Sequence, residues 1–74
     1  MFELNLRRAD HVRRYSITPA HDSGWEVRLE EDAQLRRRTH YHDWHRVEIA
    51  RALLEREVSE LTELGWVISQ STKR

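Results

Sequence analysis

The sequence predicts a two-layer α+β domain, in which a four-stranded antiparallel β-meander packs against one C-terminal α-helix. Up to residue 41, apolar residues alternate with polar ones, which is the period of a strand with one buried face. From residue 43 onward they recur every three or four residues, which is the period of a helix. The chain has only 74 residues, so we expect a single domain over residues 1–68 and a flexible tail over residues 69–74.

Two short alternating runs predict the first two strands, over residues 2–7 and 12–18. Both runs place large apolar side chains on one shared face. These residues are Phe2, Leu4, Leu6, Tyr15 and Ile17. The segment 18–24 is predicted to be the longest loop, because it collects proline, aspartate, serine and glycine.

The strongest strand signal lies in residues 25–30, where apolar and charged residues alternate without interruption. A turn over residues 31–33 leads into a fourth strand over residues 34–41, and a three-residue loop fixes the register of this hairpin. Arg37 has the parity of the inner face, so we expect it at a sheet edge with its head in water. The paired residues in the expected register are Leu29 with Leu35 and Glu26 with Arg38.

A helix is predicted from residue 44 to residue 64, with Asp43 as its N-cap and Gly65 as the residue that ends it. Trp66 is expected to fold back on the last turn. The apolar segment 66–68 forms either a short fifth strand or a flap. The expected buried stripe consists of Val47, Ala50, Leu54, Val58, Leu61 and Leu64, widened by Ile49 and Leu53.

The charges are balanced, with thirteen basic and thirteen acidic residues, which excludes a polybasic tail and an acidic solvating chain. Their predicted distribution is uneven, however. The outer face of the helix is acidic, and a strip on the outer face of the sheet is basic. We therefore expect self-association or protein contacts through unlike surfaces. The helix residues concerned are Glu48, Glu55, Glu57, Glu60 and Glu63, with Arg51 and Arg56.

Arginines on the outer face of the sheet form a candidate phosphate-binding surface, because guanidinium groups bind phosphate oxygens in a bidentate fork. Glu3, Glu26 and Glu30 share this face, and the aromatic residues that could stack on bases are assigned to the inner face. Nucleic-acid binding is therefore the alternative function, and protein contact the leading one. The candidate arginines are Arg14, Arg28, Arg36 and Arg38.

Three histidines at the junction of strand and helix are candidate metal ligands, namely His40, His42 and His45. The expected geometry argues against a site, because His45 lies in the first helical turn and Asp43 serves as the cap. We therefore expect no bound metal. A response to pH is better motivated, since the five histidines of the chain all gain charge near pH 6.5.

No constellation in the sequence predicts catalysis, because the serines lack a nucleophile elbow and two glycines cannot form a phosphate-binding loop. We expect a non-enzymatic, cytoplasmic protein without cofactor or membrane span. Trp44 either packs against the end of the sheet or, with Arg46, anchors a partner, since exposed Trp and Arg concentrate binding energy at interfaces.

Three segments carry a family resemblance: GWEV at residues 24–27, YHDWHRVE at 41–48 and LGW at 64–66. With them, the chain resembles a family of small uncharacterised bacterial proteins over nearly its whole length. That family implies no activity. Trp44-His45-Arg46 is also superficially similar to the DNA-associated WGR domain. His45 replaces the central glycine of that pattern, so DNA binding is not carried over.

Overall fold

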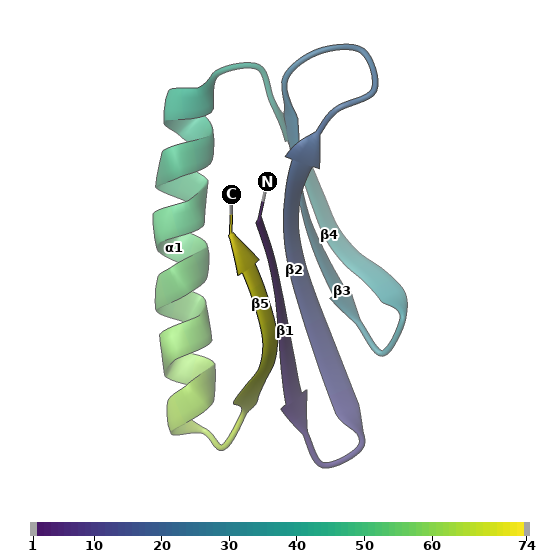
Figure 1. Ribbon diagram of the computed structural model, residues 1–74, viewed down its shortest axis with the longest axis vertical. Coiled ribbons are helices and arrows are strands. Elements are labelled where there is room, and N and C mark those ends of the chain that lie inside the picture. Colours follow the sequence, from purple (N-terminus) through teal and green to yellow (C-terminus); the bar gives the residue numbers. More distant parts are fainter. Residues whose placement is uncertain (1, 74) are drawn as a thin grey trace.

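The computed structural model describes residues 2–73, and side chains up to residue 69. Its sheet has the strand order β4-β3-β2-β1-β5, with every pair of neighbours antiparallel, and the helix covers one face (Figure 1). The predicted meander with one C-terminal helix is confirmed. The elements are β1 (Phe2–Arg8), β2 (His11–Pro19), β3 (Trp25–Glu31), β4 (Gln34–Tyr41), α1 (Trp44–Glu63) and β5 (Val67–Lys73).

The segment after the helix is a strand that pairs antiparallel with β1. It is longer than expected, because residues 69–73, which we predicted to be a tail, continue the backbone of β5. The reason is that β1 offers partners along nearly its whole length, from Phe2 to Arg7. A register shift between Asn5 and Leu6 interrupts the pairing. Residue 74 lies outside the described residues.

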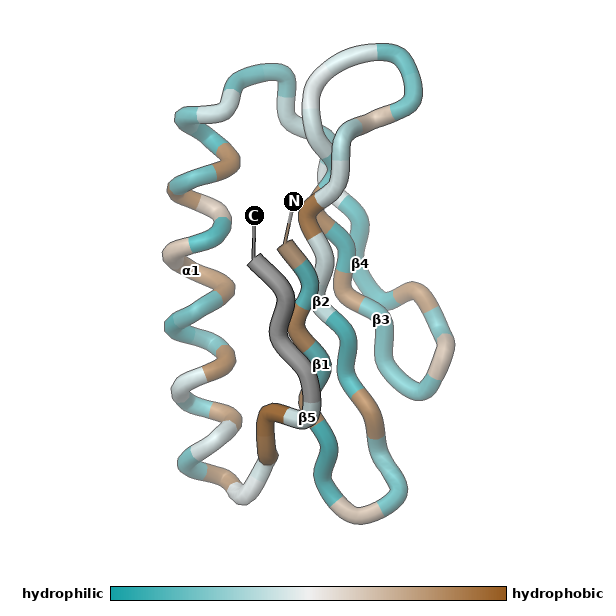
Figure 2. The backbone as a smooth tube through the Cα atoms, in the orientation of Figure 1, coloured by the Kyte–Doolittle hydropathy of each residue, from teal (hydrophilic) through white to brown (hydrophobic). Residues whose placement is uncertain are grey.

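The core lies between the sheet and α1, on the face that the alternation predicts. Figure 2 shows hydrophobic residues alternating with hydrophilic ones along the first strands and recurring along α1. Tyr15 and Leu6 are fully buried, and burying a side chain of this size contributes about 1.5–3 kcal/mol. The buried apolar residues are Phe2, Leu4, Leu6, Tyr15, Ile17, Leu29, Val47, Leu54 and Val58.

Both predicted helix ends are confirmed. The Asp43 side chain accepts a hydrogen bond from the backbone N–H of His45 at 3.0 Å. At the other end, Gly65 has φ +101°, and its N–H donates to the carbonyl of Thr62. The N–H of Trp66 donates back to Leu61, which completes a Schellman motif. Trp66 packs partly buried against the core.

The predicted register of the β3–β4 hairpin is wrong. The turn contains two residues, Asp32 and Ala33, both with positive φ, which is the pattern of a type I′ turn. The register also shifts between Leu29 and Glu30, so one extra residue of β4 bulges out. The observed pairs are Leu29 with Arg37, Glu30 with Leu35, Glu26 with His40 and Arg28 with Arg38.

Three expectations about which face a residue occupies are also wrong. Leu35 pairs with Glu30 on the outer face and is exposed, because the bulge reverses its parity. The apolar stripe of α1 is narrower than predicted, since Ile49, Leu53 and Leu64 are exposed. Glu57 was assigned to the outer face of the helix, but it binds Arg37 of β4 instead.

Candidate functional site

A solvent-exposed apolar surface lies between α1 and the edge strand β4. We call it the α1/β4 surface, and it surrounds a groove of about 340 Å³. Its central side chains, Ile49 and Leu53, are 52% and 62% exposed. A neighbouring groove of about 260 Å³ shares Tyr41, Ala50 and Leu53 with it. The residues of the α1/β4 surface are Tyr41, His45, Arg46, Ile49, Ala50 and Leu53.

The position of β4 explains why this surface stays open. In the described sheet, β4 is an edge strand, so no further strand extends beneath the side chains of Ile49 and Leu53. These two residues are one helical turn apart and therefore share a face of α1. Beside this surface, Arg37 Nη2 donates a hydrogen bond to Glu57 Oε2 at 3.1 Å, and this bond connects β4 to the helix.

The two predicted binding residues near the start of the helix differ in their contacts. Trp44 packs against another aromatic ring, and Arg46 has no ion pair among the described side chains. Trp44 packs edge to face against Trp25, with ring centroids 4.5 Å apart, and remains 39% exposed. Arg46 lines the α1/β4 surface and makes no ion pair with any residue whose side chain is described. The structure thus brings Arg46, but not the Trp44 ring, to the apolar groove.

The sequence analysis did not predict a polar cluster that lies beside the core around Arg13. Arg13 donates to Glu31 and to the hydroxyl of Tyr15, both at 3.1 Å, and lies over the Trp66 ring. Burial, and then the charge of Glu57, raise the pKa of Tyr15. Arg13 has the same parity as Tyr15 in β2, so its inward position could have been inferred.

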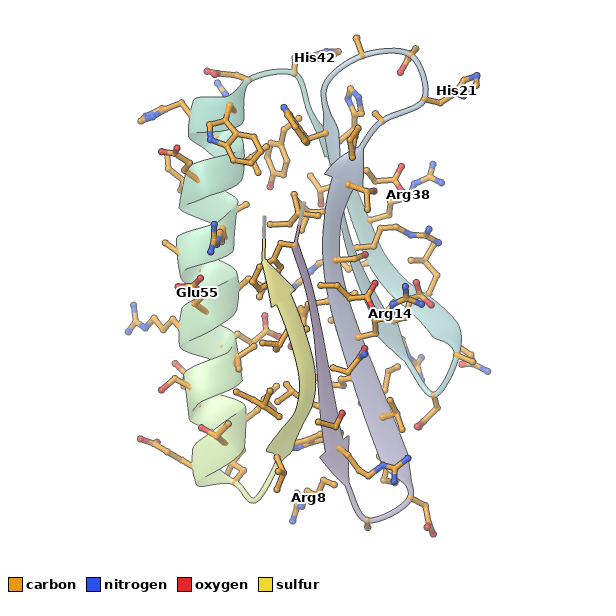
Figure 3. All side chains as sticks on the ribbon, viewed as in Figure 1. Arg8, Arg14, His21, Arg38, His42 and Glu55 are labelled. Atoms are coloured by element: carbon orange, nitrogen blue, oxygen red, sulfur yellow. The ribbon has the colours of Figure 1, made fainter. Side chains whose placement is uncertain are left out.

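The four arginines proposed for phosphate binding are all engaged by glutamates. Arg14 binds Glu3 at 2.7 Å, and this contact raises the pKa of Arg14. Arg28 lies 3.5 Å from Glu26 and 4.0 Å from Glu30. Figure 3 shows Arg14 and Arg38 on the side of the sheet opposite the helix. The two remaining ion pairs are Arg36 with Glu31 at 3.6 Å and Arg38 with Glu26 at 3.8 Å.

The three candidate metal-ligating histidines do not converge. The rings of His40 and His42 contact each other, with centroids 4.6 Å apart, but His45 lies in the first turn of α1. His40 Nε2 donates to the carbonyl oxygen of Ser23 at 2.7 Å. Among the described residues, no group of three or more His, Cys, Asp or Glu is arranged to hold a metal ion.

Comparison of the chain with known protein families, curated proteins and solved structures finds no match. Within residues 2–73, α1 is not long and apolar enough to cross a membrane. The α1/β4 surface is the candidate site on geometric grounds, because it combines exposed aliphatic side chains, a strand edge and an arginine without an ion pair among the described side chains.

Proposed function

We propose that this protein is a small non-enzymatic interaction module, which binds a protein partner or a second copy of itself through the α1/β4 surface. The observation that carries the proposal is the exposure of Ile49 and Leu53, 52% and 62%, next to one another and beside Tyr41. Exposed aliphatic residues that gather in one place, with polar residues around them, are typical of protein-binding sites.

The chemistry of the surface supports protein contact. Covering exposed aliphatic area contributes about 25 cal/mol per Å². Tyrosine and arginine, here Tyr41 and Arg46, are the residue types that most often dominate interface energies. We place this activity in the bacterial cytoplasm as part of the same proposal.

Site-specific photo-crosslinking in cells that express the protein tests this function. A benzophenone side chain is introduced at position 53, in the α1/β4 surface. The matched control carries it at position 56, where the Arg56 side chain is 79% exposed and lies outside the groove. We expect discrete protein adducts from position 53 only. Equal adducts from the two positions, or none from position 53, would contradict the proposal.

The alternative, nucleic-acid binding by Arg14, Arg28, Arg36 and Arg38, has weaker support. A phosphate would meet guanidinium groups whose positive charge a nearby glutamate already offsets, because all four arginines are ion-paired. The aromatic residues Tyr15, Trp25 and Tyr41 belong to or pack against the core on the helix side, away from these arginines. Protein contact is therefore the better-supported function.

A further inference from the structure

One side of β4 presents backbone hydrogen-bonding groups that no strand pairs. Within residues 2–73, β3 lies on one side of β4 and no strand lies on the other. In an antiparallel ladder, a strand points alternate N–H and C=O groups to each of its sides. Such an edge can accept one further strand from another chain, through main-chain hydrogen bonds. The backbone of β4 therefore favours an occupant in the extended conformation.

The helix side of this edge provides an apolar contact. Arg37, Thr39 and Tyr41 of β4 line a groove of about 260 Å³, together with residues of α1. Leu53 of α1 lines the same groove, and Ile49 lies beside Leu53 in the α1/β4 surface. A strand added next to β4 would place every second side chain on this side of the sheet. Aliphatic residues at those positions would cover the exposed Ile49 and Leu53.

The charge of β4 is basic. The strand carries Arg36, Arg37 and Arg38 and no acidic residue, and all three side chains are more than half exposed. Each of them binds a glutamate that also binds a second arginine. A guanidinium group has five N–H donors, so each of the three can bind a further carboxylate. The shared glutamates are Glu31 and Glu57, which also bind Arg13, and Glu26, which also binds Arg28.

We propose that β4 binds an extended acidic segment of another protein as a sixth strand of the sheet. Aliphatic and acidic residues alternate in this segment. The aliphatic side chains cover Ile49 and Leu53, and the acidic ones lie with Arg38 on the opposite side of the sheet (Figure 3). Arg46 has no ion pair among the described side chains and is available to a carboxylate near Tyr41. The inference rests on the proposed function, because it names the class of partner for the α1/β4 surface.

Other occupants fit this edge less well. An antiparallel two-fold pair of β4 strands that uses most of their length sets arginine opposite arginine, and like charges opposite each other are destabilising. The bulge also limits regular pairing to the stretch from Arg37 to Tyr41. An acidic segment has the opposite charge and needs only this stretch. A nucleic acid would use neither the unpaired backbone nor the aliphatic side chains.

Binding of a synthetic peptide, followed by NMR spectroscopy of the protein, tests this inference. The probe is a short peptide with capped ends, in which valine and glutamate alternate. We expect the probe to shift the backbone amide signals of residues 37–41 and to slow the exchange of their outward N–H groups with solvent. A peptide with lysine in place of glutamate should bind at least about tenfold more weakly, because its charges repel the arginines.

Two modified probes test strand pairing without changing the protein. One carries N-methyl groups on its valines and the other on its glutamates. The N–H groups of these two sets point to opposite edges of the peptide strand. Since only one edge can pair with β4, one modified probe should bind at least about tenfold more weakly than the parent, and the other should bind like the parent.

A protein variant tests the apolar contact. Leu53→Asn should weaken binding of the valine–glutamate probe at least about threefold, because it removes exposed aliphatic area from the groove. Val67→Asn is the matched control, since Val67 is also an exposed aliphatic residue, at 65%, but belongs to the opposite edge strand β5. It should bind like the wild type. Circular dichroism verifies that both variants fold.

Several results would overturn the inference. They are unshifted amides of residues 37–41 at millimolar probe, equal binding of the glutamate and lysine probes, and undiminished binding of both N-methylated probes. Loss of binding in Val67→Asn alone would assign the peptide to β5. Shifts of the same amides on raising the protein concentration alone would assign the edge to a second copy, and equal shifts with an oligonucleotide would assign it to phosphate. Each of these assignments contradicts the inference.

The proposed function fails separately from this inference. If the probe does not bind but crosslinks from position 53 reach a protein, the proposed function survives and the acidic strand is excluded. If position 53 gives no crosslinks, the proposed function falls as well.

Discussion

The indole rings of Trp25 and Trp44 meet edge to face, with their centroids 4.5 Å apart and their planes at 62°. Trp25 is the first residue of β3 and Trp44 the first of α1, so this contact joins the start of the helix to the sheet. Tyr41 pairs with Trp25 in the sheet, precedes Trp44 by three residues and lines the α1/β4 surface. The aromatic contact thus fixes the helix beside the groove.

Replacing Trp44 should reduce stability. We expect Trp44→Ala to lower the free energy of unfolding by about 1–3 kcal/mol, because it removes both the aromatic pair and partly buried area. Trp44→Phe keeps a ring on Trp25 and should lose less. Urea unfolding measures both variants. An unchanged midpoint in Trp44→Ala would show that the contact does not contribute to stability.

The contact between His11 and Asp32 should make folding depend on pH. His11 Nδ1 lies 2.9 Å from Asp32 Oδ2. The hydrogen bond to Asp32 raises the pKa of His11 above its ordinary 6.5, and the same bond lowers the pKa of Asp32 below 3.8. The stabilisation from His11 is complete below pH 6.5 and is lost as pH rises through the folded pKa. That from Asp32 is complete above pH 3.8 and is lost as pH falls.

NMR titration of His11 tests this assignment. Asp32→Asn removes the charge but keeps an oxygen that can accept from the Val12 N–H, as Asp32 Oδ1 does at 2.9 Å. The pKa of His11 should then fall towards 6.5. Asp10→Asn is the control, because Asp10 contributes least among the causes of the raised pKa. An equal fall in both variants would argue against the hydrogen bond as the main cause.

The two glycines should respond differently to substitution. Gly24 has φ +79°, and a Cβ there would lie 2.3 Å from the carbonyl oxygen of Tyr41. Gly65 has φ +101°, but its Cβ would meet only Arg8 Nε, at 3.6 Å. We expect Gly65→Ala to cost about 1–2 kcal/mol from the left-handed backbone alone, and Gly24→Ala to cost more. Thermal unfolding of the two variants gives the order, and a reversed order would contradict the contact at Gly24.

Replacing Ala33 should increase stability. Ala33 has φ +66° in the turn between β3 and β4, a conformation that glycine adopts without steric cost. Ala33→Gly should raise the free energy of unfolding by about 0.5–1 kcal/mol, net of the added flexibility of the unfolded chain. Ala52→Gly in the interior of α1 is the control with the opposite expected sign. It should lower the free energy of unfolding by about 1 kcal/mol. A loss of stability in Ala33→Gly would contradict the assigned turn.

Oligonucleotide binding should be absent, since the outer arginines are paired with glutamates. Fluorescence anisotropy with a single-stranded oligonucleotide at about 50 mM salt is a sensitive condition, because phosphate contacts strengthen as salt falls. Salt-dependent binding that is lost in Arg14→Ala would favour the nucleic-acid alternative over protein contact. Arg56→Ala, which removes a 79% exposed arginine of α1, is the control for non-specific charge effects.

The periodicity of apolar residues predicted the fold class because it indicates which side chains are buried. The alternation of Tyr15 and Ile17 and the recurrence of Val47, Leu54 and Val58 identify the buried faces, and all five residues are buried. Asp43 and Gly65 act at single positions whose backbone requirements are specific to their residue types.

The hairpin register and the candidate surface could not be obtained in this way. A bulge depends on hydrogen bonds between two strands, and the hydrophobic pattern around Leu35 does not reveal one. Ile49 and Leu53 fit a helix stripe as well as Val47 does, but whether they are covered depends on where the sheet ends beneath them. Arg46 was proposed for binding from its residue type and lies at the groove, whereas the role of Glu57 required the position of Arg37.

The pairing of β5 with β1 affects how the chain folds during its synthesis. These strands lie side by side although they are far apart in the sequence (Figure 1). During synthesis on the ribosome, the free edge of β1 stays unprotected until residues 67–73 have left the exit tunnel. Contacts between such distant segments also form late in folding. β1 therefore keeps one pairing-competent edge exposed until residues 67–73 are available to cover it.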